Sequence, residues 1–112
     1  MDDCVFCKII NKVLPTEILL ETETVVAFRT IEPMAEFHIL IVSKKHVADF
    51  ISLNIKTDSE VILDIFEAAQ ELVNSLNLKS GYKLVFNGGK YIEVQHIHLH
   101  LLGGKLYENF VN

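Results

Sequence analysis

The sequence is poor in basic residues and has no long apolar run. Its ten lysine and arginine residues are outnumbered by fifteen aspartate and glutamate residues, which gives a net charge of −5. A chain with this charge balance is not expected to carry the broad basic surface that binds a nucleic-acid backbone. The longest apolar run, residues 37–42, includes a histidine and is far shorter than the roughly 18–20 residues of a membrane span. The composition therefore argues against both a nucleic-acid-binding and a membrane-embedded protein.

Signals that would divide the chain or direct it to export are also missing. No linker rich in Gly, Ser or Pro interrupts the sequence, and no basic stretch follows Met1 to begin a secretory signal. Half of the 112 residues are apolar, 9% are aromatic and 22% are charged, which is typical of a folded chain. We therefore expect one domain over residues 1–112, in an intracellular, cytoplasmic protein.

Hydrophobic periodicity predicts an α+β fold. A Thr-x-x-Glu capping box at Thr57 and Glu60 precedes the apolar stripe of one long helix, and Pro15 follows a short N-terminal helix. Apolar and β-branched runs predict five strands, at residues 18–20, 24–28, 38–43, 82–86 and 93–102. Gly103 and Gly104 are expected to end the last strand. Short links between strands favour an antiparallel sheet of about five strands.

Three of the five histidines lie in the segment Gln95-His-Ile-His-Leu-His-Leu-Leu102. On a strand, alternate side chains share a face, so His96, His98 and His100 would point one way and the apolar residues between them toward the core. The pattern has three interpretations: incidental alternation, a three-histidine metal site, or a division of labour. In the last, one imidazole is a nucleophile and its neighbours set its tautomer or contact a charged substrate.

Strand geometry argues against a metal held by all three histidines. Side chains two residues apart on one face are separated by about 6.6–7 Å, and the outer pair by about 13 Å. A metal needs nitrogen ligands at about 2.0–2.1 Å. Two neighbouring histidines could meet this requirement, but three on a regular strand could not. The division of labour is therefore the preferred interpretation.

The two cysteines, Cys4 and Cys7, are three residues apart. In a reducing compartment this spacing suggests metal or redox chemistry before a structural disulfide. Three interpretations stay open: two reduced cysteines packed as small apolar residues, a thioredoxin-like redox pair, or half of a structural metal site. A zinc site needs two further ligands from elsewhere in the chain.

Several segments together resemble the histidine triad (HIT) superfamily, in particular its Hint-like branch. The resemblance extends from Asp3 to Gly104. It rests on Cys4-Val-Phe-Cys-Lys-Ile-Ile, on Ala27-Phe-Arg-Thr-Ile-x-Pro33, on His38-Ile-Leu-Ile-Val-x-Lys-Lys-His46, and most specifically on Glu93-Val-x-His-Ile-His-Leu-His-Leu-Leu-Gly-Gly104. Their occurrence in the family's order makes the resemblance stronger than the triad alone.

The resemblance implies a homodimeric nucleotide phosphoramidase that acts on adenosine phosphoramidates. By analogy His98 attacks the α-phosphorus and becomes transiently nucleotidylated, His100 contacts the phosphate oxygens, and His96 orients the site. The other implied contacts to an AMP-type purine nucleotide are Phe6, Ile9, Phe28, Ile31, His38, Asn87 and Glu93. Backbone N–H groups of the loop 87–89 would support the developing negative charge.

Some relatives also carry structural zinc on a cysteine pair and two histidines. The corresponding residues here are Cys4, Cys7, His46 and His96. The resemblance therefore implies a zinc site that ties the N-terminus to the segment that carries the nucleophile.

This chain departs from the family pattern at two places in the implied nucleotide site. Thr30 stands where an acidic residue usually binds the ribose hydroxyls, and Tyr91-Ile92 stand where a Gly-Gln pair is common. The loop before the triad is also about two residues shorter than usual. These departures support an alternative function, a nucleotide-binding regulatory or scaffold protein with weak catalysis.

Overall fold

The apolar patterns of the sequence correspond to two α-helices, two short 3-10 helices and five strands in the computed structural model, which describes residues 3–107. Both ends of the expected domain, residues 1–2 and 108–112, lie outside the described residues. The elements are α1 (Val5–Ile10), β1 (Ile18–Glu21), β2 (Val25–Arg29), β3 (Ala35–Ser43), η1 (Phe50–Ser52), α2 (Ser59–Ser75), β4 (Tyr82–Phe86), η2 (Gly89–Tyr91) and β5 (His98–Leu106).

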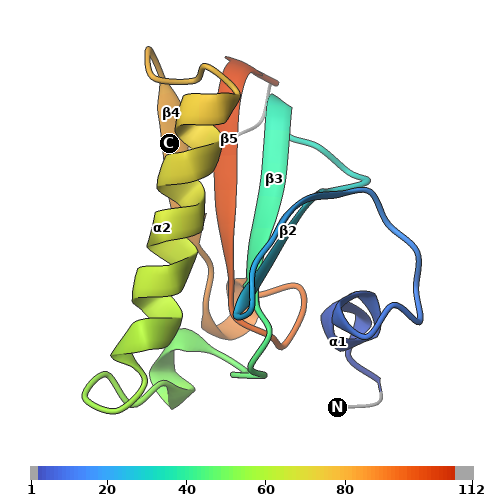
Figure 1. The fold of residues 1–112 in the computed structure, drawn as a ribbon, viewed down its shortest axis with the longest axis vertical. Coiled ribbons are helices and arrows are strands. Elements are labelled where there is room, and N and C mark those ends of the chain that lie inside the picture. Colours follow the sequence, from blue (N-terminus) through green and yellow to red (C-terminus); the bar gives the residue numbers. More distant parts are fainter. Residues whose placement is uncertain (1–2, 108–112) are drawn as a thin grey trace.

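The five strands form one antiparallel sheet in the order β1-β2-β3-β5-β4. The predicted α+β class and strand number are therefore confirmed. At the centre of the sheet, β3 and β5 pair so that Leu40 lies opposite His100 and Val42 opposite His98. The long helix α2 covers one face of the sheet, and the short helix α1 lies on the other side (Figure 1).

The α2 face of the sheet is apolar and buried. Its core joins Ile65, Ala69 and Leu72 of the helix to alternate residues of the central strands, such as Ile41 and Leu101. The larger of these side chains, such as Ile65 and Leu101, stabilise the fold by about 1.5–3 kcal/mol each when fully buried. The expected packing of the apolar side of the last strand under the long helix is confirmed.

The α1 face is built from the intervening residues of the same strands. Phe6 and Ile9 of α1 pack against Phe28, Leu40 and Val42 of β2 and β3. Because side chains alternate along a strand, the histidines of β5 emerge on this face, while Leu99 and Leu101 take part in the core under α2. The fold thus brings the imidazoles and the N-terminal helix together.

Several predicted boundaries differ from the structure, among them the start of β3, which lies at Ala35 rather than at residue 38. The last strand begins at His98 rather than at residue 93, and it continues through Gly103 to Leu106. A Cβ at Gly103 would lie 2.9 Å from Leu78 Cδ1, so glycine allows the strand to pass close to this leucine. The long helix has Asp58 as its N-cap, not Thr57. The Asp58 carboxylate makes no capping bond and instead accepts hydrogen bonds from Lys45 Nζ and Asn54 N, which hold the turn before the helix.

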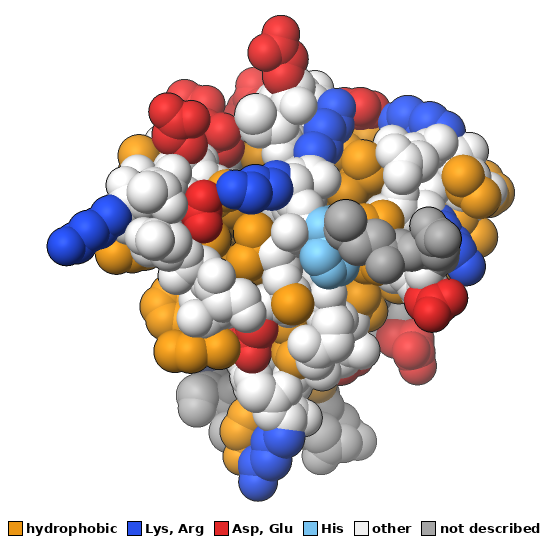
Figure 2. Space-filling model, turned by 90° about the horizontal axis from the view of Figure 1, so that it is seen from below, with side chains coloured by type: hydrophobic (Ala, Val, Ile, Leu, Met, Phe, Trp, Pro, Cys, Tyr) orange, Lys and Arg blue, Asp and Glu red, His pale blue; other side chains and the backbone are white. Residues whose placement is uncertain are grey.

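The surface carries charges of both signs. On the face drawn in Figure 2, basic side chains are separated by acidic, apolar and uncharged groups. Within residues 3–107, no helix combines the length and apolarity that a membrane span requires.

Candidate functional site

The candidate site lies on the α1 face of the sheet and has two parts, a histidine pocket and a Cys/His cluster. His98 and His100 enter the pocket from β5, and His38 enters it from β3. His96 precedes β5 and belongs to the cluster, so the three triad histidines do not share one strand face as expected. The chain turns sharply just before the strand, where His96 N donates to Val94 O at 2.7 Å.

The surroundings of His98 define its tautomer. Its Nδ1 lies 2.8 Å from the backbone carbonyl oxygen of His96, which can only accept a hydrogen bond. Nδ1 therefore carries the proton in the neutral ring, and Nε2 keeps a free lone pair. Burial lowers the pKa of His98 below its usual value, so the ring is neutral at pH 7. An uncharged nitrogen with a free lone pair is what a nucleophile requires.

A chain of hydrogen bonds from Met34 through His38 places the proton of His100 on Nε2, the opposite tautomer to that of His98. The Met34 N–H donates to His38 Nδ1 at 2.9 Å, so the neutral His38 ring carries its proton on Nε2. His38 Nε2 lies 2.9 Å from His100 Nδ1 and donates to it. His100 is thereby left with its proton on Nε2. The pocket contains one imidazole with a free lone pair, at His98, beside one that presents an N–H donor.

Burial also keeps the His100 ring neutral. Burial, and then the charged forms of His98 and His38, lower the pKa of His100 to about 4. Burial also lowers the pKa of His38. The Asn87 amide nitrogen lies 3.4 Å from His100 Nε2, and the amide orientation that satisfies the Nε2 proton turns the amide oxygen toward it. The Nε2 proton of His100 is then held by a long contact to Asn87, which a bound phosphate oxygen would replace.

The pocket has a volume of about 510 Å³, within the usual range for small-ligand sites. Its walls include every residue that the sequence analysis assigned to nucleotide contact except Asn87, which reaches the site through His100. Those lining residues are Phe6, Ile9, Phe28, Thr30, Ile31, His38, Glu93, His98 and His100. Ile31 is 93% exposed and lies at the rim, whereas Phe6 and Phe28 form an edge-to-face pair in the wall.

Two polar groups of the site are already engaged within the chain. The Asp49 carboxylate accepts from Gly89 N at 2.9 Å, so this N–H of the loop 87–89 does not face the pocket as a free donor. Thr30 Oγ1 accepts from Glu32 N at 3.3 Å. Sequence reasoning missed Asp49 because its partner lies 40 residues away. The contact of Met34 with His38 could not be predicted either, because it is made by a backbone N–H, which every residue except proline has.

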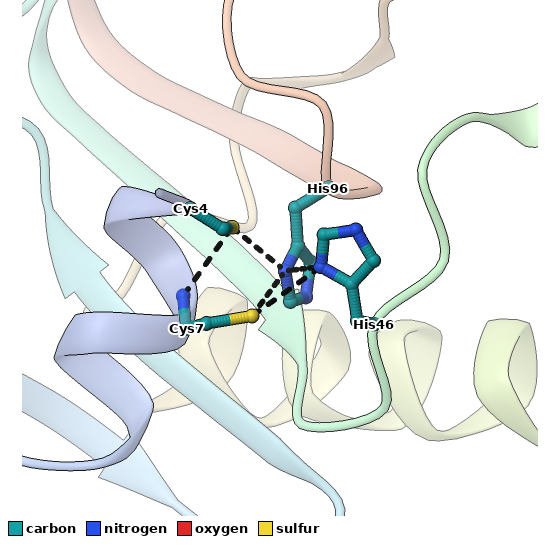
Figure 3. Close-up of side chains that lie close together, drawn as sticks. All are labelled: Cys4, Cys7, His46 and His96. Carbon is teal, nitrogen blue, oxygen red and sulfur yellow. Dashed lines mark hydrogen bonds between the residues drawn. The ribbon is translucent and has the colours of Figure 1, made fainter. Parts of the chain in front are cut away.

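The second part of the site is a cluster of Cys4, Cys7, His46 and His96, whose ligand atoms all lie within 4.8 Å of one another (Figure 3). Cys4 Sγ is 3.4 Å and Cys7 Sγ is 3.6 Å from His96 Nδ1, and the two Nδ1 atoms are 3.1 Å apart. Cys7 Sγ lies 3.3 Å from His46 Nδ1. Tetrahedral ligands with bonds of about 2.1 Å to nitrogen and 2.3 Å to sulfur are separated by about 3.3–3.8 Å. Four of the six ligand pairs are therefore close to the spacing of a metal centre, and the four side chains have the ligand chemistry for one.

Local hydrogen bonds orient the cysteine sulfurs and the His96 ring of this cluster. Cys4 is the N-cap of α1, and its Sγ accepts from Cys7 N at 3.4 Å, which keeps both sulfurs on the first turn of the helix. His96 is fully buried, and its Nε2 donates to Ser43 O at 2.7 Å. The lone pair of His96 Nδ1 consequently points into the cluster. Metal-binding histidines commonly use the second nitrogen in this way.

Comparison with known proteins gives one consistent result. The model of the HIT domain matches residues 11–106. A HIT-like protein of Rickettsia prowazekii (strain Madrid E) is 34% identical, with 96% of this chain and 92% of the relative covered.

Two solved structures agree with this match. A HIT family hydrolase from Legionella pneumophila Philadelphia 1 has 42% identity and a TM-score of 0.88, covering 92% of this chain and 94% of that one. A histidine triad nucleotide-binding protein from Candida albicans has 32% identity and a TM-score of 0.83, covering 92% and 76%.

Proposed function

Because the chain belongs to the HIT domain family, we propose that it is a nucleotide hydrolase that cleaves adenosine 5′-phosphoramidates through a nucleotidylated His98. Relatives described as a HIT family hydrolase and as a histidine triad nucleotide-binding protein support the general class. The observation that carries the specific proposal is the free Nε2 lone pair of His98, in a pocket large enough for a nucleoside monophosphate.

The first step transfers the nucleotidyl group to the protein. His98 Nε2 attacks the α-phosphorus, the P–N bond breaks, and the leaving amine takes up a proton from water. The His98 ring becomes positively charged, and the His96 carbonyl oxygen stabilises it by accepting from Nδ1. The Nε2–H of His100 donates to a phosphate oxygen, on which negative charge develops.

The second step restores the protein. Water attacks the phosphorus of nucleotidyl-His98, the N–P bond breaks, and the nucleoside monophosphate leaves. The attacking water releases a proton, which neutralises the hydroxide left when the amine was protonated in the first step. The net reaction therefore consumes one water molecule. Phe6, Ile9, Phe28 and Ile31 would enclose the base and ribose between steps.

The proposal is tested by the turnover of adenosine 5′-phosphoramidate with wild-type protein, His98→Ala and Gln95→Ala. The exposed Gln95 side chain lies on the same segment and serves as the matched control. Removing the nucleophile should lower kcat by at least about 10³-fold while AMP still binds, and the control should keep its activity. Turnover that survives in His98→Ala would refute the mechanism.

The engagement of Gly89 N by Asp49 and of Thr30 Oγ1 by Glu32 N favours a second candidate, a nucleotide-binding regulatory or scaffold protein with weak catalysis. The same assay separates the two functions. The second predicts AMP binding by the wild type with no turnover above that of His98→Ala.

Zinc is the cation proposed for the Cys/His cluster, because two thiolates and two imidazoles are ligands that it prefers. Cys4, Cys7, His46 and His96 would fill all four positions, so the role would be structural. Bound zinc would cross-link the N-terminal helix to the segment before β5. A cytoplasmic location is part of this proposal, since a reducing compartment keeps the cysteine pair available for metal.

A homodimer is proposed through the β4 edge of the sheet. β4 is the last strand in the sheet order, and its side chains Tyr82 and Leu84 are 49% and 44% exposed. With Phe66 of α2 they border a groove of about 640 Å³. A second copy would pair with the edge strand and cover these apolar side chains. Light scattering should then give twice the monomer mass, and a species of 12.7 kDa at micromolar concentration would contradict it.

A further inference from the structure

We infer that His96 is a positioning residue through which the Cys/His cluster controls the tautomer of the His98 nucleophile. This inference rests on the proposed role of His98. The side chain of His96 contributes Nδ1 to the cluster, while its backbone carbonyl accepts from His98 Nδ1 at 2.8 Å. His96 therefore connects the cluster to the Nδ1–H of His98, and the position of that proton decides whether His98 Nε2 can attack.

The sheet does not hold the His96 carbonyl in place. β5 begins at His98, so the peptide that follows His96 lies outside the ladder. The neighbouring backbone bonds are Val94 O to His96 N and Val47 O to Ile97 N, each 2.7 Å. Because the peptide that joins His96 to Ile97 is planar, the bond from Ile97 N to Val47 O also sets the direction of the His96 carbonyl. Val47 follows His46, so both sides of this bond are attached to cluster residues, on one side through His46 and on the other through the His96 side chain. The anchors of that side chain are Ser43 O and the cluster.

The N-terminal helix provides a second connection between the cluster and the pocket. Cys4 and Cys7 hold the first turn of α1, and Phe6 projects from that turn. The Phe6 ring lies edge-on to both His96 and His98, with centroid separations of 5.9 Å and 4.9 Å. A cluster that holds its sulfurs firmly also holds Phe6 against the nucleophile.

Loading of the cluster should change how firmly this arrangement is held. Without a shared cation, its members are joined only by contacts of 3.1–3.6 Å, three of which involve sulfur, a weak hydrogen-bonding atom. When the His96 carbonyl moves away, the His98 proton can transfer through water from Nδ1 to Nε2. That neutral tautomer has no lone pair on Nε2. The fraction of His98 able to attack falls, although the nucleotide still fits the pocket.

The test measures the His98 tautomer directly by long-range 15N–1H NMR on the full-length protein with labelled histidine. Spectra are recorded with one equivalent of zinc chloride, after chelation, and after zinc is restored. Cys7→Ser removes a ligand that does not touch His98, and Ile65→Val in the α2 core is the matched control. We expect the Nδ1–H tautomer alone in the zinc-loaded protein and in loaded Ile65→Val. Chelation and Cys7→Ser should each give a mixture, which zinc reverses only in the chelated wild type.

Kinetics on the same samples should show kcat lower by about 10- to 100-fold with KM little changed, the effect typical of outer-shell residues. A His98 tautomer that stays the same with and without zinc would overturn the inference, as would failure of the wild type to bind zinc. The NMR result needs no turnover. A zinc-dependent tautomer in a protein that hydrolyses no phosphoramidate would refute the proposed function alone.

Discussion

The two faces of the sheet use alternate residues of the same strands but place different chemistry on them. The α2 face buries apolar side chains such as Ile65 and Leu101. The α1 face buries imidazoles, each with a hydrogen-bonding partner, and no buried side-chain N or O atom in residues 3–107 lacks one. Burial on the first face stabilises the fold, whereas burial on the second keeps histidines neutral and fixes their tautomers. The comparison predicts that damage to the two faces should have separable effects.

Removal of zinc should produce the largest effect and should affect the α1 face first. A ligand present at 1,000 times its Kd stabilises the folded state by about 4 kcal/mol, so chelation should lower the melting temperature by many degrees. Hydrogen exchange should show faster exchange of α1 and residues 92–97, with α2 changed much less. Equal melting temperatures with zinc and with chelator would indicate two plain reduced cysteines instead.

Truncation of the opposite face should cost stability without changing the chemistry. Leu101→Ala removes a fully buried side chain from the α2 core and should lower the free energy of unfolding by about 2–5 kcal/mol. The kcat per folded molecule should stay within twofold of the wild type, because Leu101 points away from the pocket. Denaturant unfolding and active-site titration measure the two quantities. A large fall in kcat would show that the faces are not independent.

The folding pattern was largely predictable from sequence, because hydrophobic periodicity reports which face of an element is buried. The pattern predicts the long helix, the five strands and the position of Leu99 and Leu101 under that helix, and the structure confirms all three. The close contacts of the site were less accessible. His96 leaves the strand because of a local turn, which the alternating pattern His-x-His-x-His conceals.

Tertiary partners explain the remaining differences. Asp58, not Thr57, is the N-cap, and its carboxylate binds Lys45 and Asn54 in the preceding turn instead of capping the helix. No residue type in the sequence indicates that Met34 N sets the tautomer of His38 or that Asp49 binds Gly89 N. These contacts depend on how loops return to the sheet, and residue types alone do not specify that path.

Acid should destabilise the α1 face through His100. Its folded-state pKa of about 4 lies below the ordinary value of 6.5, so the unfolded chain binds more protons between these pH values. The free energy of unfolding should therefore be highest above pH 6.5 and fall by about 2–4 kcal/mol as the pH drops toward 4. Denaturant melts at several pH values measure it. His100→Gln should make this slope shallower without abolishing it, because the pKa values of His38 and His98 are also lowered. Ile65→Val should lower the whole curve without changing its shape. An unchanged slope in His100→Gln would contradict the assignment.

The smallest expected effect concerns the ribose end of the pocket. Thr30→Asp introduces a carboxylate that can accept from ribose hydroxyls, which should strengthen AMP binding by about 1–1.5 kcal/mol, or roughly five- to tenfold in Kd. Calorimetry with AMP and its 2′,3′-dideoxy analogue measures the gain. Thr16→Asp places the same charge elsewhere on the pocket wall and should not help. An equal gain for the dideoxy analogue would exclude a ribose contact.

The most direct test of the α1 face as a reaction centre is to trap the nucleotidylated protein. Wild-type protein is mixed with adenosine 5′-phosphoramidate, quenched within milliseconds, and mapped by peptide mass spectrometry under conditions that preserve phosphorus–nitrogen bonds. The account predicts a nucleotidyl group on His98, formed and lost at rates consistent with kcat, and absent from His98→Ala. A nucleotidyl group on another residue, or steady turnover with no modified His98 at any time, would contradict it.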